Sequence, residues 1–221
     1  MLTANELSAP VRFNPLRRAL TIIQAEKGTY IYLNVLYYGL VLLGMAYVTF
    51  FNPKLQETLM QYAGQAYNEG SLAAVGSAYN GGHVIQAMII TFIVNLFLGS
   101  MLEMSLPSLI IPFSGLLMGI YRAILWGLLL SPSNASLAGP MIPHSLTLLI
   151  EGQAYILVML AIYIQGKAFL RPQAFGIQGR LHGYIEGLKR TVWIYLLVAL
   201  LLAIAAIYEA VEVIYLAPLF Q

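Results

Sequence analysis

The sequence of 221 residues contains no cysteine and no aspartate. The lack of cysteine excludes disulfides, thiolate catalysis, iron–sulfur clusters and cysteine-ligated zinc, and it leaves the redox compartment open. Charge is scarce as well, at 9% of the residues against roughly 25% in a soluble domain. The net charge of +2 is too small to predict nucleic-acid binding. Because 60% of the residues are hydrophobic, so little charge could not cover a soluble surface, and the composition predicts an integral membrane protein.

Five segments are apolar enough to cross a bilayer, which takes about 20 mostly apolar residues. They are residues 30–51, 84–102, 109–130, 143–164 and 191–217. We therefore predict an all-α, polytopic membrane protein with a basic segment at 1–29 and a five-helix transmembrane domain at 30–217.

The basic residues indicate the orientation of this domain. Nine of the eleven Lys and Arg residues lie either before residue 30 or between residues 165 and 190. Four predicted spans separate these regions, which places both on one side of the membrane. Cytoplasmic loops are the ones enriched in Lys and Arg. We expect a multi-pass protein of the cell membrane with a cytoplasmic N-terminus and an extracytoplasmic C-terminus.

The segment before the first span predicts a short helix at the membrane surface. Asn14 is a good N-cap and Pro15 fits the first helical position. Leu16, Ala19, Leu20 and Ile23 then share a face, and Gly28 can close the helix. The neighbouring basic residues, which would face anionic lipid on the inner leaflet, are Arg12, Arg17 and Arg18. The alternative is a frayed basic leader.

Two connections also have recognisable patterns. Residues 53–80 predict one or two amphipathic helices on the outer face, with Leu55, Leu59, Tyr62 and Ala66 at helical spacing. Residues 167–190 carry a glycine every fourth position from 179 to 187. Such a row favours close packing inside a membrane helix. Outside the apolar stretch we interpret it as a flexible basic connection.

A few polar residues remain inside the predicted spans. Counted from the outer ends of their helices at about 1.5 Å per residue, Arg122, Glu151 and Glu209 lie at the same depth, roughly 12 Å below the boundary. Each charge costs about 2.5–3.5 kcal/mol when buried alone, so these side chains should face one another and not lipid. The predicted polar layer consists of Arg122, Glu151, Glu209, Glu212, His144 and Asn95.

Charge balance within this layer predicts its pairing. We expect Arg122 to pair with Glu151 or Glu209. One Arg cannot neutralise three Glu, so at least one carboxyl should be protonated or meet water, His144 or a cation. Glu103 is interpreted as an interfacial carboxylate at the inner end of the second span. The layer can be an ion-pair clamp, a polar cavity facing a substrate or partner, or a proton or ion relay.

Catalysis is not predicted. The histidines at 83, 144 and 182 fall in three separate segments, and the chain has no His-Glu-x-x-His, Gly-x-Ser-x-Gly or Walker-type motif. His144 and Glu151 would supply only two ligands of an incomplete metal site. We therefore expect no enzyme activity, cofactor or metal.

Several features resemble the stage II sporulation protein M family. They are the basic N-terminal segment, Asn95, Pro143-His144 ahead of Glu151-Gly152-Gln153-Ala154-Tyr155, a basic glycine-rich connection, and Ala206-Ile207-Tyr208-Glu209 in the last helix. The likeness covers helices 2 to 5. The family pattern has Gly after the His and Glu about four residues on, whereas this chain has Ser145 and a Glu seven residues on. The resemblance implies a multi-spanning scaffold that docks other membrane or cell-envelope proteins, including cell-wall hydrolases in spore formers.

Two functions remain open at this point. The first is a non-enzymatic scaffold or complex subunit in the lipid bilayer, capable of forming a homo-oligomer. The alternative is a permease or transport subunit in which Arg122, Glu151 and Glu209 line a pathway. A water-accessible cavity that reaches the polar layer would favour transport, and a dry ion-pair core would favour the scaffold.

Overall fold

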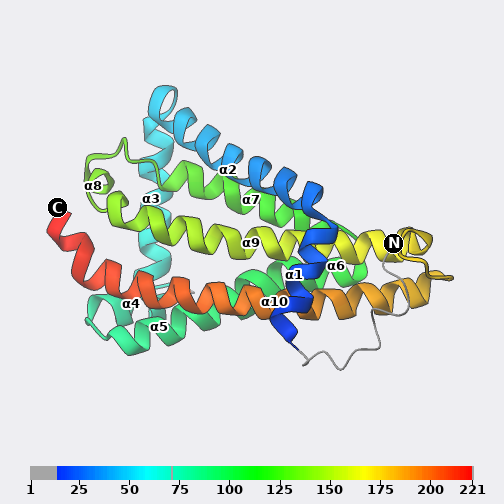
Figure 1. Ribbon diagram of the computed structural model, residues 1–221. Coiled ribbons are helices and arrows are strands. Elements are labelled where there is room, and N and C mark those ends of the chain that lie inside the picture. Colours follow the sequence, from blue (N-terminus) through cyan, green and yellow to red (C-terminus); the bar gives the residue numbers. More distant parts are fainter. Residues whose placement is uncertain (1–13, 71, 221) are drawn as a thin grey trace.

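The computed structural model describes residues 14–70 and 72–220, which form an all-helical bundle without strands (Figure 1). Four helical segments in this part of the chain are long and apolar enough to cross a membrane: Lys27–Phe50, Val84–Ile110, Met141–Leu170 and Arg180–Phe220. They fit a multi-pass membrane protein. The segment predicted as the third of five spans forms the shorter helix α7 (Ser114–Leu129) of 16 residues. At 1.5 Å per residue α7 is about 24 Å long, less than the roughly 30 Å hydrocarbon core.

Helix α9 (Met141–Leu170) is the centre of the bundle. Of the 18 residues in its most apolar stretch, 78% are buried, whereas 22–33% are buried in the corresponding stretches of the other three long segments. In this position its neighbours cover its apolar sides. The other long segments therefore expose much of their apolar surface, as expected where lipid surrounds them.

The longest partner of α9 is α10 (Arg180–Val211), which continues through the π-helix η4 (Glu212–Leu216) and the 3₁₀-helix η5 (Ala217–Phe220). The prediction of a flexible connection at 167–190 is wrong. Only a short turn with the 3₁₀-helix η3 (Pro172–Phe175) separates α9 from α10. Gly179 is the N-cap of α10, and Gly183 and Gly187 pack on α9: Gly183 lies against the carbonyl of Ala168, and a Cβ at Gly187 would lie 2.9 Å from Cα of Gln165.

The second predicted span is longer than expected and is not a regular α-helix. Helix α5 (Val84–Ile93) runs into the π-helix η2 (Val94–Ser105) and then into α6 (Leu106–Ile110). Pro107 lacks an N–H and would clash with a carbonyl one turn earlier in a regular α-helix. The wider π turns ahead of Pro107 shift the hydrogen-bonding pattern, so the helix passes through this proline and does not stop at residue 102.

Helices α2 (Lys27–Phe50) and α7 form a close pair beside α9, visible in Figure 1. A Cβ at Gly44 would lie 3.0 Å from Cα of Gly127, so the two backbones approach through paired glycines. The turn before α7 occupies residues 111–113 and includes Phe113, which has a left-handed backbone with φ 71°. This turn contains Pro112, and it shortens the segment predicted at 109–130.

The predicted N-terminal helix is present as α1 (Pro15–Ala25), and the side chain of Asn14 accepts a hydrogen bond from the backbone N–H of Arg17. It ends at Ala25, not at Gly28, which lies inside α2. Its buried residues are Ala19 and Ile22, and Leu16 and Leu20 of the predicted apolar face are exposed. The predicted basic residue Arg12 lies outside the described residues, and Arg17 and Arg18 are exposed.

The connection between the first two long segments contains two helices, α3 (Pro53–Asn68) and α4 (Ala73–Asn80). Figure 1 shows α3 crossing the bundle near the end at which α2 and α7 finish, where the short helix α8 (Ala135–Ala138) also lies. Of the predicted apolar face of α3, Leu55, Leu59 and Ala66 are partly buried and Tyr62 is exposed, while the buried residue of this helix is Gln56. Gln56 donates to the carbonyls of Leu129 (3.0 Å) and Ser131 (2.8 Å), which caps the C-terminal end of α7.

Candidate functional site: an intramembrane polar cavity

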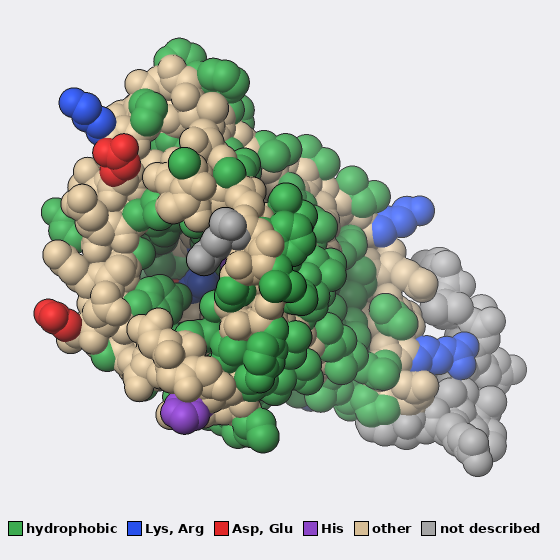
Figure 2. Space-filling view, turned by 90° about the vertical axis from the view of Figure 1, so that its left-hand side faces the viewer, with side chains coloured by type: hydrophobic (Ala, Val, Ile, Leu, Met, Phe, Trp, Pro, Cys, Tyr) green, Lys and Arg blue, Asp and Glu red, His purple; other side chains and the backbone are tan. Residues whose placement is uncertain are grey.

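A cavity of about 760 Å³ lies between α5–η2, α7 and α9 and is covered in part by α3 and α4. Figure 2 views the molecule from the end near α3 and shows a hollow with a Lys or Arg side chain inside it. Among the described residues that line the cavity, Arg122 is the basic one. Arg122 lies seven residues from the last residue of α7, so the cavity reaches about 11 Å into the bundle along this helix.

Five of the six residues of the predicted polar layer line this cavity. They are Asn95, Arg122, His144, Glu151 and Glu209. The sixth, Glu212, lies behind the cavity wall and hydrogen-bonds His144. Residues from four separate segments of the chain therefore converge on one space.

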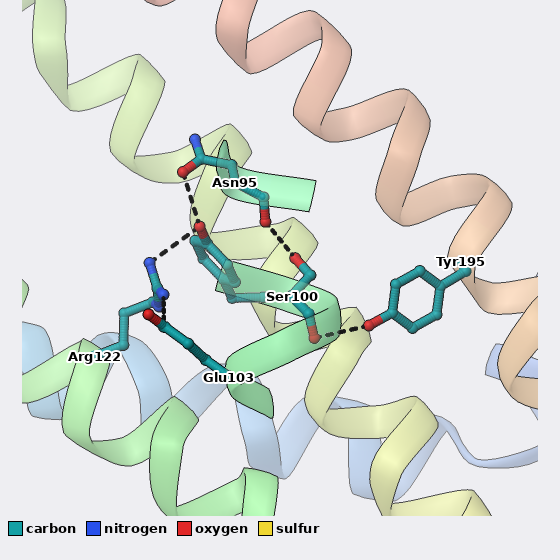
Figure 3. Close-up of polar contacts among 6 residues, drawn as sticks. Asn95, Ser100, Glu103, Arg122 and Tyr195 are labelled. Carbon is teal, nitrogen blue, oxygen red and sulfur yellow. Dashed lines mark hydrogen bonds and ion pairs between the residues drawn. The ribbon is translucent and has the colours of Figure 1, made fainter. Parts of the chain in front are cut away.

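The ion-pair partner of Arg122 is Glu103, so the predicted pairing with Glu151 or Glu209 is wrong. Nη2 of Arg122 lies 2.6 Å from Oε2 of Glu103, and Figure 3 shows the two side chains pointing toward each other from neighbouring helices. Nη1 donates to the hydroxyl of Tyr155 at 3.1 Å, and the guanidinium lies 4.2 Å from the centroid of that ring. Glu103 lies seven residues before the end of the long apolar segment Val84–Ile110, and its side chain is 48% exposed.

Glu103 and Asn95 both reach the cavity because they are eight residues apart and share one helix face. The cavity-lining positions of this segment recur at spacings of three and four, as Thr91, Val94, Asn95, Leu98, Gly99, Leu102 and Glu103. The backbone of Val94–Ser105 is nevertheless π-helical. Two hydroxyl groups donate hydrogen bonds to backbone carbonyls of this irregular segment (Figure 3). The hydroxyl of Ser100 donates to the carbonyl of Asn95, and the hydroxyl of Tyr195 in α10 donates to the carbonyl of Ser100, each at 2.9 Å. Irregular backbone at membrane depth is tolerated where it is covered by protein or lines a cavity.

His144 and Glu212 form a second polar contact next to the cavity. Nδ1 of His144 lies 2.9 Å from Oε2 of Glu212, and the hydroxyl of Thr147 donates to the same oxygen at 3.3 Å. The side chain of Glu212 is 1% exposed, so these two hydrogen bonds compensate for burying its carboxylate. This contact joins the first turns of α9 to η4.

Glu151 and Glu209 stand apart from these pairs. The ion pairs of the described residues involve the carboxylates of Glu26, Glu103, Glu186 and Glu212. Glu151 instead lies beside the hydroxyl of Tyr155, and Glu209 beside that of Tyr79. Both carboxyls line the cavity.

The site is rich in carboxyl groups and has a largely apolar wall. Three glutamates and one arginine line it, and Glu103 matches the charge of Arg122. In the described part of the chain, no group of three or more His or Glu residues lies close enough to hold a metal ion. The arrangement can bind and orient a small solute through hydrogen bonds and charge.

Sequence reasoning did not find three residues of the site. Tyr155 appeared only as part of a motif, although it contacts both Arg122 and Asn95. Trp126 and Tyr67 contribute aromatic wall. The spacing of Trp126, four residues after Arg122, and of Tyr155, four residues after Glu151, was the available signal, because residues four apart share a helix face.

Comparisons of the chain with protein-family models, curated proteins and solved structures gave no match. The resemblance to stage II sporulation protein M therefore stays a prediction.

Proposed function

We propose that this protein is a membrane transport component that binds a small organic cation in the cavity between α5–η2, α7 and α9. The observation that supports this proposal is the cavity itself, because it reaches the intramembrane charges and is large enough for a solute. Its volume of about 760 Å³ falls within the roughly 300–1,000 Å³ range of small-molecule sites. A dry ion-pair core would have supported a purely structural role.

The charge of the lining supports a cation as the solute. Glu103 matches the charge of Arg122, and Glu151 and Glu209 remain at the cavity wall without an ion pair among the described residues. Apolar and aromatic side chains, including Trp126 and Tyr67, surround these carboxyls. A solute with one positive charge and an apolar body would satisfy both parts of this lining.

In this proposal α7 also crosses the membrane, giving five passes in total. It is packed along α2 and α9 inside the bundle, and neighbouring loops can bring its ends to the interfaces. The N-terminus is cytoplasmic because most basic residues lie at the end of the bundle that contains the α9–α10 turn. The cavity then opens toward the outside of the cell membrane.

Binding of a matched pair of probes tests this proposal. Tetraphenylphosphonium and tetraphenylborate have almost the same shape and opposite charges. The chain has two tryptophans, so replacing Trp193 with Phe leaves Trp126 as a fluorescence reporter in the cavity wall. We expect tetraphenylphosphonium to change Trp126 fluorescence with a saturable curve in detergent-purified protein and tetraphenylborate to produce no saturable change.

Carboxyl variants identify the site of binding. Glu151→Gln and Glu209→Gln should each weaken tetraphenylphosphonium binding about tenfold, because losing a nearby charge removes on the order of 1–2 kcal/mol of attraction. Glu186→Gln is the matched control, since Glu186 pairs with Arg190 away from the cavity. Equal saturable binding of both probes, or no effect of either cavity variant, would contradict the proposal.

A scaffold or complex subunit is the second candidate, as the resemblance to stage II sporulation protein M implies. The observation that favours it is the solvent-exposed face of α1, where Leu16 and Leu20 are exposed beside Arg17. Such a face could dock a membrane-associated partner as well as lipid. Loss of a copurifying partner on Leu16→Glu, with unchanged cation binding, would support this function for α1.

A further inference from the structure

A smaller pocket lies toward the opposite end of the bundle from the large cavity. This pocket has a volume of about 70 Å³ and lies between α6, the end of α9 and the start of α10. Its walls include Ser108, Pro112, Gln165 and Tyr184. Gln165 lies five residues before the end of α9, or about 8 Å along the helix, which places the pocket near the end that carries the basic residues.

Gln165 gives this pocket its chemistry. Its side chain is 2% exposed, and neither its amide nitrogen nor its amide oxygen has a hydrogen-bond partner among the described residues. Buried amides without partners are rare in proteins, because burial removes the hydrogen bonds that water would supply. A pocket of this size can hold about two water molecules at roughly 30 Å³ each.

Three apolar side chains separate the pocket from the larger cavity. Met104, Met159 and Ile162 are all at most 1% exposed. A Cβ at Gly119 would lie 2.6 Å from Sδ of Met159, and one at Gly115 would lie 2.6 Å from Cδ1 of Ile162. The two glycines of α7 therefore leave room for the side chains of Met159 and Ile162 against this helix.

We propose that the pocket at Gln165 is the water-filled inner end of the pathway whose outer end is the large cavity, with Met104, Met159 and Ile162 as the barrier between them. This inference rests on the proposed transport function. Tyr155 at the outer side of the barrier and Gln165 at the inner side are ten residues apart on α9, or about 15 Å. The barrier is thus short, and its two methionines are the side chains best able to change conformation.

The backbone beside the pocket supports this assignment. The turn that links α6 to α7 holds Phe113 in a left-handed conformation, and the ring of Phe113 packs against Gly166, next to Gln165. A residue other than glycine in this conformation is strained, and such strain often lies at sites that change shape. Ile110, at the edge of the pocket, is 80% exposed.

Cysteine labelling in the full chain tests the inference, because the protein contains no cysteine of its own. The reagent is a trimethylammonium methanethiosulfonate, which is cationic and does not cross membranes. It is added to intact cells or to inside-out vesicles made from them. Ala63→Cys reports on the large cavity and Gln165→Cys on the inner pocket. Ala161→Cys is the control for a dry site, because Ala161 lies in the packing between α9 and α10 and its carbonyl accepts a hydrogen bond from the hydroxyl of Thr191.

We expect Ala63→Cys to react from the outside and Gln165→Cys from the inside, each at least about tenfold faster than Ala161→Cys, since a thiol in dry surroundings ionises poorly. Ser108→Cys, a nearly isosteric change in the same pocket, should behave as Gln165→Cys does and replaces it if that variant does not fold. Inner-pocket thiols that react from neither side, or from the outside, would overturn the inference.

The two proposals fail separately in this experiment. If Ala63→Cys reacts and both inner-pocket variants do not, the outer cavity stands and the inner pocket is only a packing defect. If the inner-pocket variants react from the inside and Ala63→Cys does not react from the outside, the hydrated inner pocket stands and the proposed outer binding cavity is contradicted.

Discussion

The contact between Arg122 and Glu103 allows a quantitative test of how the bundle holds its buried charge. Arg122 makes three contacts: the ion pair at 2.6 Å, a hydrogen bond to Tyr155 at 3.1 Å, and a position 4.2 Å from the centroid of the same ring. Glu103→Gln removes the first and leaves the contacts with Tyr155. Arg122→Gln removes all three. The double variant completes a thermodynamic cycle that isolates the direct interaction.

The expected magnitude follows from distance and exposure. Opposite charges with centres about 4 Å apart attract by about 4 kcal/mol at an effective dielectric constant of 20. Desolvation offsets part of this attraction, and Glu103 is 48% exposed on its side chain, which screens it further. We expect a coupling free energy of about 1–3 kcal/mol. Arg122→Gln alone should cost more than this coupling, because it also removes the hydrogen bond and the ring contact with Tyr155.

The free energy of unfolding is measured by titrating the protein in mixed micelles with a denaturing detergent. Fluorescence of Trp126 reports on folding, since its ring centroid lies 5.7 Å from that of Tyr155. The cycle of Arg122 with Glu209 is the comparison, with an expected coupling below about 0.5 kcal/mol. A larger coupling with Glu209 than with Glu103 would refute the pairing, and so would strict additivity of Arg122→Gln and Glu103→Gln.

Two further changes test how α7 is held in place. Gly44→Leu should lower the free energy of unfolding by about 1–3 kcal/mol, because the new side chain would press on the backbone of Gly127. Gly39→Leu is the control and should change the melting temperature little, because open space surrounds Gly39. Gln56→Leu should cost about 1–3 kcal/mol by leaving two carbonyls at the end of α7 without a donor, whereas the exposed Gln61→Leu should be nearly neutral. Unchanged melting temperatures for Gly44→Leu or Gln56→Leu would contradict these contacts.

The local features of the fold were predictable because they depend on neighbouring residues only. Asn14-Pro15 begins a helix in the sequence and in the structure, since an N-cap side chain and the fixed φ of proline act over one turn. Apolar runs of sufficient length identify the four long segments. Helix ends were less accurate, because α10 begins at Arg180, well before the apolar run.

The sequence alone determined the membrane setting, the four long apolar segments and the small number of positions that carry charge. These features follow from composition and from the length of the apolar runs, because both set the free energy of transfer out of water. The rotation of each helix was decided only by the tertiary structure. Packing of η2 beside α7 brings Glu103 to Arg122, and close packing turns Gly183 and Gly187 of α10 onto α9. A buried charge takes the partner that helix rotation and register bring within reach, and those depend on packing between segments far apart in the chain.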